Sequence, residues 1–315
     1  MKKNLQRCGC VVLTLVLIWV GVHKLGYYLR PVDTDACVNA IQSFHDMPKN
    51  EYEVIGYGSS HLWRGFEPKE LYDTYGIKAY NYGCNWQNID TTLLFLKDSL
   101  RTQKPKVALI ETYNVGSFKD NQDMDGEIYY TTAIPGISLK KEYLTSALGN
   151  DKERWLSYYM PLCAFHDNWI NLTKDSFYKD VSYSYDFHKT AGFMGGENSM
   201  PIDIPDYRDF EQADLFTGSV ARLDEIVRVC RENDIQIVFY TAPYVGPYCY
   251  FDAMDRYAKE NGQVYINLFE HMDEIGIDTK TDFSDEGHLN SQGARKVSAY
   301  LGKFLVENYE LTDYR

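Results

Sequence analysis

The sequence lacks the cysteine patterns that organise disulfide-rich or zinc-binding domains. Its seven cysteines are scattered over 315 residues, and they form neither a C-x-x-C pair nor a Cys/His cluster at zinc spacing. We therefore expect no disulfide framework, no metal site and no cofactor.

Positive charge is also scarce. The chain has 32 Lys and Arg against 45 Asp and Glu, a net charge of −13, and no Lys/Arg stripe overrides this balance locally. Because nucleic acid is bound by basic surfaces, nucleic-acid binding is excluded as a function. There is no internal repeat or low-complexity tract, and a chain that is 44% apolar and 15% aromatic is expected to be globular.

One long apolar run is present, at the N-terminus. It extends from Cys8 to Val22 after a start that carries Lys and Arg, and it continues weakly to Arg30. A helix of about 20 residues crosses about 30 Å of hydrocarbon, so residues 1–30 are predicted to be a single-pass membrane anchor. A cleaved signal peptide is the alternative, although no clear cleavage site follows Val22. In both cases the basic start stays in the cytoplasm and the rest is extracytoplasmic, or secreted if the leader is cleaved.

Short β-rich runs alternate with helical periodicity in most of the remaining chain. Residues 31–50 are predicted to be a linker with one short helix, and residues 51–315 to form the working domain. The predicted strands are 52–57, 78–82, 107–112, 236–241 and 263–268, and the predicted helices are 68–75, 89–101, 219–232, 252–260 and 291–306. This alternation predicts an α/β sandwich on a parallel five-stranded sheet, with the functional loops at the carboxyl ends of the strands.

The alternation is absent from about residue 116 to residue 215, a stretch rich in Tyr, Trp and Phe. Because so long a loop without structure is improbable inside a compact domain, we predict a large inserted cap or subdomain over the strand ends. Its aromatic side chains either line a glycan cleft, by stacking on sugar rings, or pack the insertion's own small core.

Two short blocks carry the residues that could perform chemistry. Asp285 precedes His288 by three residues, so that a carboxylate on one turn can hold the imidazole of a general base; an ordinary acidic surface turn is the alternative. Gly58-Ser59-Ser60 follows the first predicted strand, where a serine hydroxyl would project at the carboxyl edge of the sheet. The G-x-S-x-G nucleophile elbow is absent, and a plain turn is the alternative there.

Together the two blocks resemble the SGNH/GDSL hydrolase superfamily. The resemblance covers roughly Glu51 to Val115 and Phe216 to Glu307, and it implies a flavodoxin-like three-layer α/β/α sandwich. It implies a nucleophile at Ser60, with Ser59 in place of the usual aspartate, and a D-x-x-H block at Asp285 and His288.

The resemblance also implies an oxyanion hole. Its donors would be the backbone N–H groups of Ser60 and Gly83 and the side chain of Asn114, the one residue of the family's G-x-N-D block that is retained. Asn85 could supply the amide instead.

The implied activity is that of a serine esterase or O-acyltransferase on acyl groups of a cell-envelope or exported polysaccharide. The membrane-anchored members of the family that the chain resembles act in teichoic-acid D-alanylation and polysaccharide O-acylation, and the first of these is an alternative function. A non-catalytic glycan-binding scaffold is another. His61 and Glu111 are further candidate substrate contacts; His61 could instead pack on the first helical turn, and Glu111 could pair with Arg64.

Overall fold

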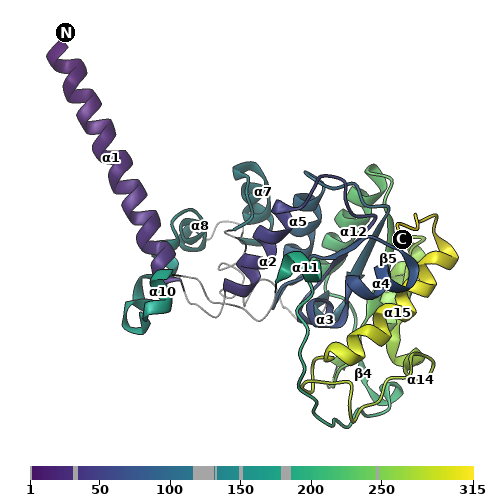
Figure 1. The fold of residues 1–315 in the computed structure, drawn as a ribbon. Coiled ribbons are helices and arrows are strands. Elements are labelled where there is room, and N and C mark those ends of the chain that lie inside the picture. The colour runs from purple at the N-terminus through teal and green to yellow at the C-terminus, as the bar shows by residue number, and fades with distance from the viewer. Residues whose placement is uncertain are drawn as a thin grey trace.

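The computed structural model describes residues 2–30, 35–115, 131, 133–148, 152–178, 186–245 and 248–315. Its centre is a parallel five-stranded sheet in the order β2-β1-β3-β5-β7, with helices on both faces (Figure 1). The strands are β1 (Val54–Tyr57), β2 (Ala79–Asn81), β3 (Val107–Glu111), β5 (Gln236–Thr241) and β7 (Val264–Asn267). Counted along the chain this order is 2-1-3-4-5, the flavodoxin-like order. The predicted fold class is confirmed.

The helices form the outer two layers. Two clusters of buried apolar side chains, contributed by helices and strands, fill the space between these layers and the sheet. One face of the sheet is covered by α2 (Asp35–Asp46), α5 (Ile89–Ser99), α12 (Thr217–Glu232) and α13 (Phe251–Glu260). The other face is covered by α3 (Ser60–Gly65), α4 (Pro68–Tyr75) and α15 (Ser291–Asn308). The strands are apolar on both faces because both are covered; all five residues of β3 are buried.

Local sequence signals set the helix ends that matter for the site. Asn88 caps α5 by accepting a hydrogen bond from the Thr91 N–H, and Asn290 caps α15 by accepting from the N–H groups of Gln292 and Gly293. Because these caps follow the loops after β2 and β7, they fix the loops at the carboxyl edge of the sheet.

The predicted linker at residues 31–50 is corrected by the structure. The short helix is present as α2, but two of its side chains, Ile41 and Phe44, are completely buried. The Phe44 ring stacks on Tyr82 with 4.0 Å between centroids. The helix therefore belongs to the core of the α/β domain, and its amphipathic spacing was the signal for this.

The helices of the insertion pack on different parts of the molecule. Its described helices are α7 (Ile137–Leu148), α8 (Lys152–Tyr159), α9 (Pro161–Phe165), η2 (His166–Asn171), α10 (Lys174–Tyr178), α11 (Phe187–Thr190) and η3 (Tyr207–Asp209). Helix α7 packs on α5, whereas α9, η2 and α10 contact α1. The following segment, residues 191–198, runs along the loops that carry the predicted site. Among the described residues, this segment is the part of the insertion that lies where a cap was predicted.

The remaining elements are small. A two-stranded parallel sheet of β4 (Glu211–Gln212) and β6 (Tyr248–Cys249) packs beside α13. Three short helices complete the described chain: η1 (Tyr113–Val115), η4 (Leu268–His271) and α14 (Met272–Ile275).

The N-terminal helix α1 (Lys2–Leu29) projects from the body of the molecule (Figure 1). Within it, the 24 residues Gln6–Leu29 are long and apolar enough to cross a membrane. Side chains such as Leu17 and Trp19 are about 60% exposed. This helix is compatible with membrane association.

Candidate active site

The serine block lies where β1 ends and α3 begins. Ser60 is the first residue of α3, and Ser59 is its N-cap. Gly58 must lack a side chain, because a Cβ there would lie 2.7 Å from the Cβ of Glu111 on the neighbouring strand. The close approach of β1 and β3 therefore places the Ser60 hydroxyl at the carboxyl edge of the sheet, at the point where the strand order reverses.

The histidine block is a tight turn just before α15. Ser284 N–H donates to the His288 carbonyl at 2.9 Å, and an isolated bridge joins Phe283 to Leu289. Both apolar residues are buried, and Asn290 then caps α15. The base of the turn is therefore buried, and the helix that follows it is capped. Both features fix the turn, which carries the His288 imidazole on its outer part.

Ser60 and His288, which are 228 positions apart in the chain, are brought together by these two loops. His288 Nε2 lies 2.7 Å from Ser60 Oγ, and His288 Nδ1 lies 2.7 Å from Asp285 Oδ1. The Gly287 N–H donates to the same Asp285 oxygen at 2.9 Å. A hydroxyl, an imidazole and a carboxylate joined in this way can pass the hydroxyl proton to the imidazole.

The electrostatic setting keeps the imidazole neutral and the carboxylate charged. Burial lowers the pKa of His288, against the opposing effect of Asp285, and the nearby Arg64 lowers it further. For Asp285 burial acts upward, but His288, the Gly287 N–H and Arg64 together bring its pKa below the usual value. A neutral imidazole with Nδ1 donating to a carboxylate has Nε2 available to accept a proton from a hydroxyl.

Glu111 lies at the end of β3, where its carboxyl group bonds to the serine loop and to its own loop. Its carboxyl group is buried at the end of β3, where it accepts hydrogen bonds from Ser59 Oγ at 3.2 Å and from the Tyr113 N–H at 2.8 Å. Hydrogen bonds from the Ser59 and Ala242 backbone also reach it, and burial raises its pKa to about 8. Glu111 therefore joins the loops after β1, β3 and β5, and it does not pair with Arg64, which lies 3.8 Å from Asp285 instead.

The residues predicted as oxyanion donors differ in the hydrogen bonds that they already make. The Gly83 N–H donates to Asn81 Oδ1 at 3.2 Å, and one hydrogen of the Asn114 side-chain amide is used by the Gln87 carbonyl at 2.8 Å. An amide nitrogen has a second hydrogen, for which the described residues provide no acceptor. The structure records no hydrogen bond for the Asn85 side chain within the described residues, and Asn85 is half-buried.

His61 is buried and faces the site from behind His288. Its ring stacks on Tyr113 with 3.7 Å between centroids and lies 5.2 Å from the His288 ring. Burial, and then the charge of His288, lower the pKa of His61 well below the usual value. With 5% of its surface exposed, His61 packs on the first helical turn, which was the alternative to a substrate contact.

Asn81 is a structural residue of the site that sequence reasoning missed. At the end of β2, its amide nitrogen lies within hydrogen-bond distance of the carbonyls of Leu62, Trp63 and Phe66, where α3 ends. It thus holds the carboxyl end of the helix whose amino end carries Ser60. A polar residue ending a buried strand was the available signal.

No group of three or more His, Cys, Asp and Glu side chains within the described ranges is arranged to hold a metal ion.

Comparisons with known proteins add little. No family model matches the chain, and no curated protein matches it. One similar solved structure, of a Bacteroides fragilis protein described only as a candidate acylhydrolase, is 12% identical, with a TM-score of 0.39. The match covers 85% of this chain and 94% of that one. So weak a likeness carries no argument about function, which must come from the site itself.

Proposed function

We propose that this chain is a serine esterase or O-acyltransferase of the SGNH type. The observation that carries the proposal is the chain of two 2.7 Å contacts from Ser60 Oγ to His288 and from His288 to Asp285. Such an arrangement between remote loops serves no evident packing purpose, since His288 is only partly buried. It does serve the activation of a hydroxyl group.

In the proposed mechanism His288 Nε2 takes the proton of Ser60 as Oγ attacks an ester carbonyl. The resulting oxyanion is stabilised by the Ser60 N–H, at the start of α3, and by the remaining amide hydrogen of Asn114. The protonated His288 then gives its proton to the leaving alcohol, and an acyl group remains on Ser60. Water or a sugar hydroxyl, deprotonated by His288, attacks this acyl-enzyme and releases Ser60.

The proposed substrate is an acylated polysaccharide of the cell envelope or an exported polysaccharide. Helix α1 would hold the α/β domain, which includes α2, at the extracytoplasmic membrane surface. On the loop after β2, Trp86 is 64% exposed in a left-handed backbone conformation with φ of 58°. Hydrogen bonds from Cys84 N–H to Gly58 and from Asn114 to Gln87 fix this loop beside the serine. An exposed indole on a loop that is held in this way suits stacking on a sugar ring.

A second candidate function is a glycan-binding scaffold without turnover. One observation favours it: the N–H of Gly83 donates to Asn81 and is not aimed at a substrate oxygen. In that case the serine would be present without sufficient oxyanion stabilisation.

The test is turnover and trapping with p-nitrophenyl acetate, using the full chain in detergent. The proposal predicts hydrolysis by the wild type, an acetyl group on the peptide carrying Ser60, and loss of both in Ser60→Ala. Ser138→Ala, an exposed serine on α7, is the matched control and should behave as wild type. A strict transferase would still acquire the acetyl group. Absence of both turnover and acetylation would favour the scaffold.

A further inference from the structure

Helix α1 is continuously exposed over only part of its length. Every residue from Cys8 to Gly21 is exposed, and the next buried residue of the helix is Gly26. These 14 residues rise about 21 Å along the helix axis. A hydrocarbon layer of about 30 Å takes about 20 residues, so a span that starts at Cys8 ends near Tyr27. If α1 is the membrane anchor proposed above, the turn that contains Gly26 therefore lies at the outer boundary of the hydrocarbon.

The insertion packs on α1 at this boundary. A Cβ on Gly26 would lie 2.6 Å from the backbone of α9, so the two helices make direct backbone contact. On η2, the amide of Asn168 donates to the Leu29 carbonyl at 2.6 Å. On α10, the ring of Phe177 lies 5.6 Å from that of Tyr28. These contacts hold α9, η2 and α10 against the last turn of α1, and we call the four together the foot of α1.

The foot of α1 exposes large apolar side chains. Trp169 and Ile170 on η2 are 66% and 68% exposed, and Phe177 on α10 is 53% exposed. Lys174, at the start of α10, is exposed as well. Trp is enriched at the membrane–water interface, and basic side chains there anchor the ends of apolar spans. The composition of these two helices therefore fits the outer interface of a bilayer.

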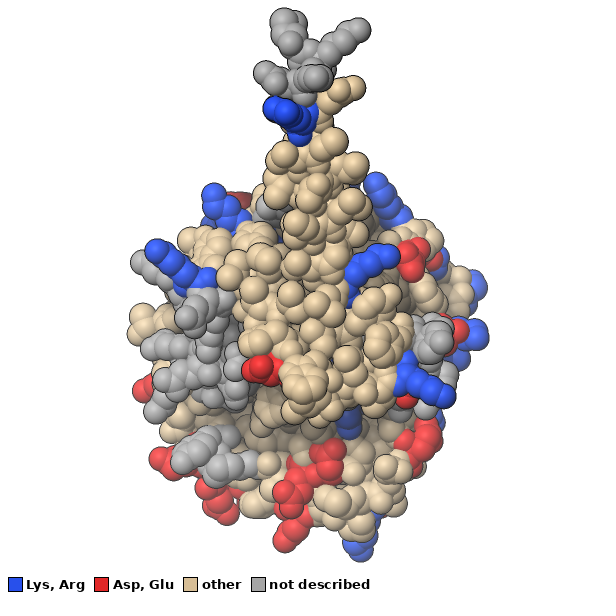
Figure 2. Space-filling view, turned by 90° about the vertical axis from the view of Figure 1, so that its left-hand side faces the viewer, with Lys and Arg blue, Asp and Glu red and all other residues tan. Residues whose placement is uncertain are grey.

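Acidic residues indicate how deep the foot of α1 can lie. Asp167 is close to Trp169 on η2, and its side chain is 91% exposed. Because a carboxylate is costly in hydrocarbon, η2 fits the level of the lipid headgroups, where an indole is favourable. Figure 2 shows the side of the molecule that carries α1. Lys and Arg lie to either side of the helix, and most of the Asp and Glu in view lie toward the lower edge, away from it.

We propose that the foot of α1 is embedded in the outer interface of the bilayer, with Trp169, Ile170 and Phe177 in contact with lipid. The partner is the lipid bilayer because the span that α1 needs includes the turn on which these helices pack. A single spanning helix fixes one point of the chain, whereas a second contact beside it holds the insertion in one orientation on the membrane. This inference rests on the proposed membrane anchoring, and it is independent of the proposed esterase activity.

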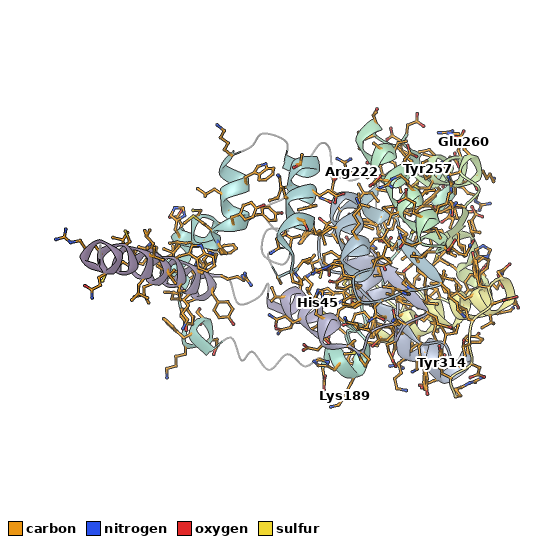
Figure 3. All side chains as sticks on the ribbon, turned by 90° about the horizontal axis from the view of Figure 1, so that it is seen from above. His45, Lys189, Arg222, Tyr257, Glu260 and Tyr314 are labelled. Atoms are coloured by element: carbon orange, nitrogen blue, oxygen red, sulfur yellow. The ribbon has the colours of Figure 1, made fainter. Side chains whose placement is uncertain are left out.

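The test is site-specific photo-crosslinking to lipid. The full chain is reconstituted in vesicles of phosphatidylcholine and phosphatidylglycerol, with benzoylphenylalanine introduced singly in place of Leu17, Trp169 or Tyr314. All three side chains are exposed, so the replacements leave the core intact. Leu17 lies near the middle of α1, and Tyr314 lies at the opposite end of the molecule (Figure 3). Lipid adducts are measured by mass spectrometry.

The expected yield of lipid adducts at Trp169 is within about threefold of the yield at Leu17 and about tenfold or more above the yield at Tyr314. The Leu17 position reports on the anchoring alone, and the Tyr314 position reports on lipid contacts that do not depend on position. The comparison of the three yields therefore isolates the contact made by the foot of α1.

Two results would overturn the proposal and leave the anchoring intact. One is adduct formation at Leu17 with a yield at Trp169 no higher than at Tyr314. The other is crosslinking at Trp169 to a second copy of the chain in preference to lipid, which would identify the surface as a dimer interface. Absence of adducts at Leu17 would reject the anchoring and this inference with it. None of these measurements depends on catalysis, so failure of the proposed esterase activity would not alter them.

Discussion

At the carboxyl edge of the sheet, side chains are fixed by hydrogen bonds to backbone and to one another, whereas around the foot of α1 several large apolar side chains are exposed. Asn81, Glu111 and Asn290 each bind two or more backbone groups from different loops. On η2 and α10, by contrast, Trp169 and Phe177 lie on the surface. The first region has the rigidity that chemistry requires. The second exposes large apolar side chains beside a helix that is compatible with membrane association.

The largest expected effect at the sheet edge, apart from loss of the nucleophile, is that of Asp285→Asn. The amide keeps the size of the side chain but favours the wrong imidazole tautomer, so kcat should fall by about 10³- to 10⁴-fold. The measurement is kcat for p-nitrophenyl acetate. A loss below tenfold would mean that Asp285 does not orient His288. The sheet edge would then differ less from the foot of α1 in how firmly its side chains are fixed.

Asn114→Ala is expected to lower kcat by about 10²- to 10³-fold with little change in KM, as for loss of one oxyanion donor. Asn85→Ala is the matched variant, because either amide could be the donor. If Asn85→Ala gives the larger loss, the assignment of the two residues is reversed. If neither variant loses activity, the oxyanion hole is elsewhere.

The pH dependence of kcat/KM should report the lowered pKa of His288. The base must be neutral, so the rate should be constant near neutral pH and fall about tenfold per unit below a pKa that is itself below the ordinary value of about 6.5. A midpoint above pH 7 would contradict this environment for the imidazole.

The smallest expected effect is that of Glu111→Gln, and it concerns the thermal stability of the folded chain. Because burial raises the pKa of Glu111 in the folded state to about 8, folding favours the protonated form. The stabilising contribution of protonated Glu111 is complete below the unfolded-state pKa of about 4.3, and it is lost as the pH rises toward 8. The Tm difference between Glu111→Gln and wild type should therefore shift in favour of the variant between pH 5 and 8. A difference that is constant with pH would mean that Glu111 is ionised throughout.

The sheet edge was also the more predictable region. Helix α4 and strand β5 have the predicted bounds, since Pro68 and Gly76 mark the ends of the helix and a continuous apolar run marks the strand. The spacing from Asp285 to His288 indicated their contact. Contacts between remote loops leave no such local pattern: neither the bonds of Glu111 to three loops nor the occupied N–H of Gly83 could be predicted. The position of the insertion could not be predicted either, because it depends on backbone contact at Gly26 and on exposed side chains without periodicity.

The central claim is that His288 activates Ser60, and fluorophosphonate labelling tests it most directly. The account predicts that the wild-type chain is labelled at Ser60, that labelling is lost in Ser60→Ala, and that it is slowed severely in His288→Ala. Labelling that persists in Ser60→Ala, or that proceeds at the wild-type rate in His288→Ala, would contradict it.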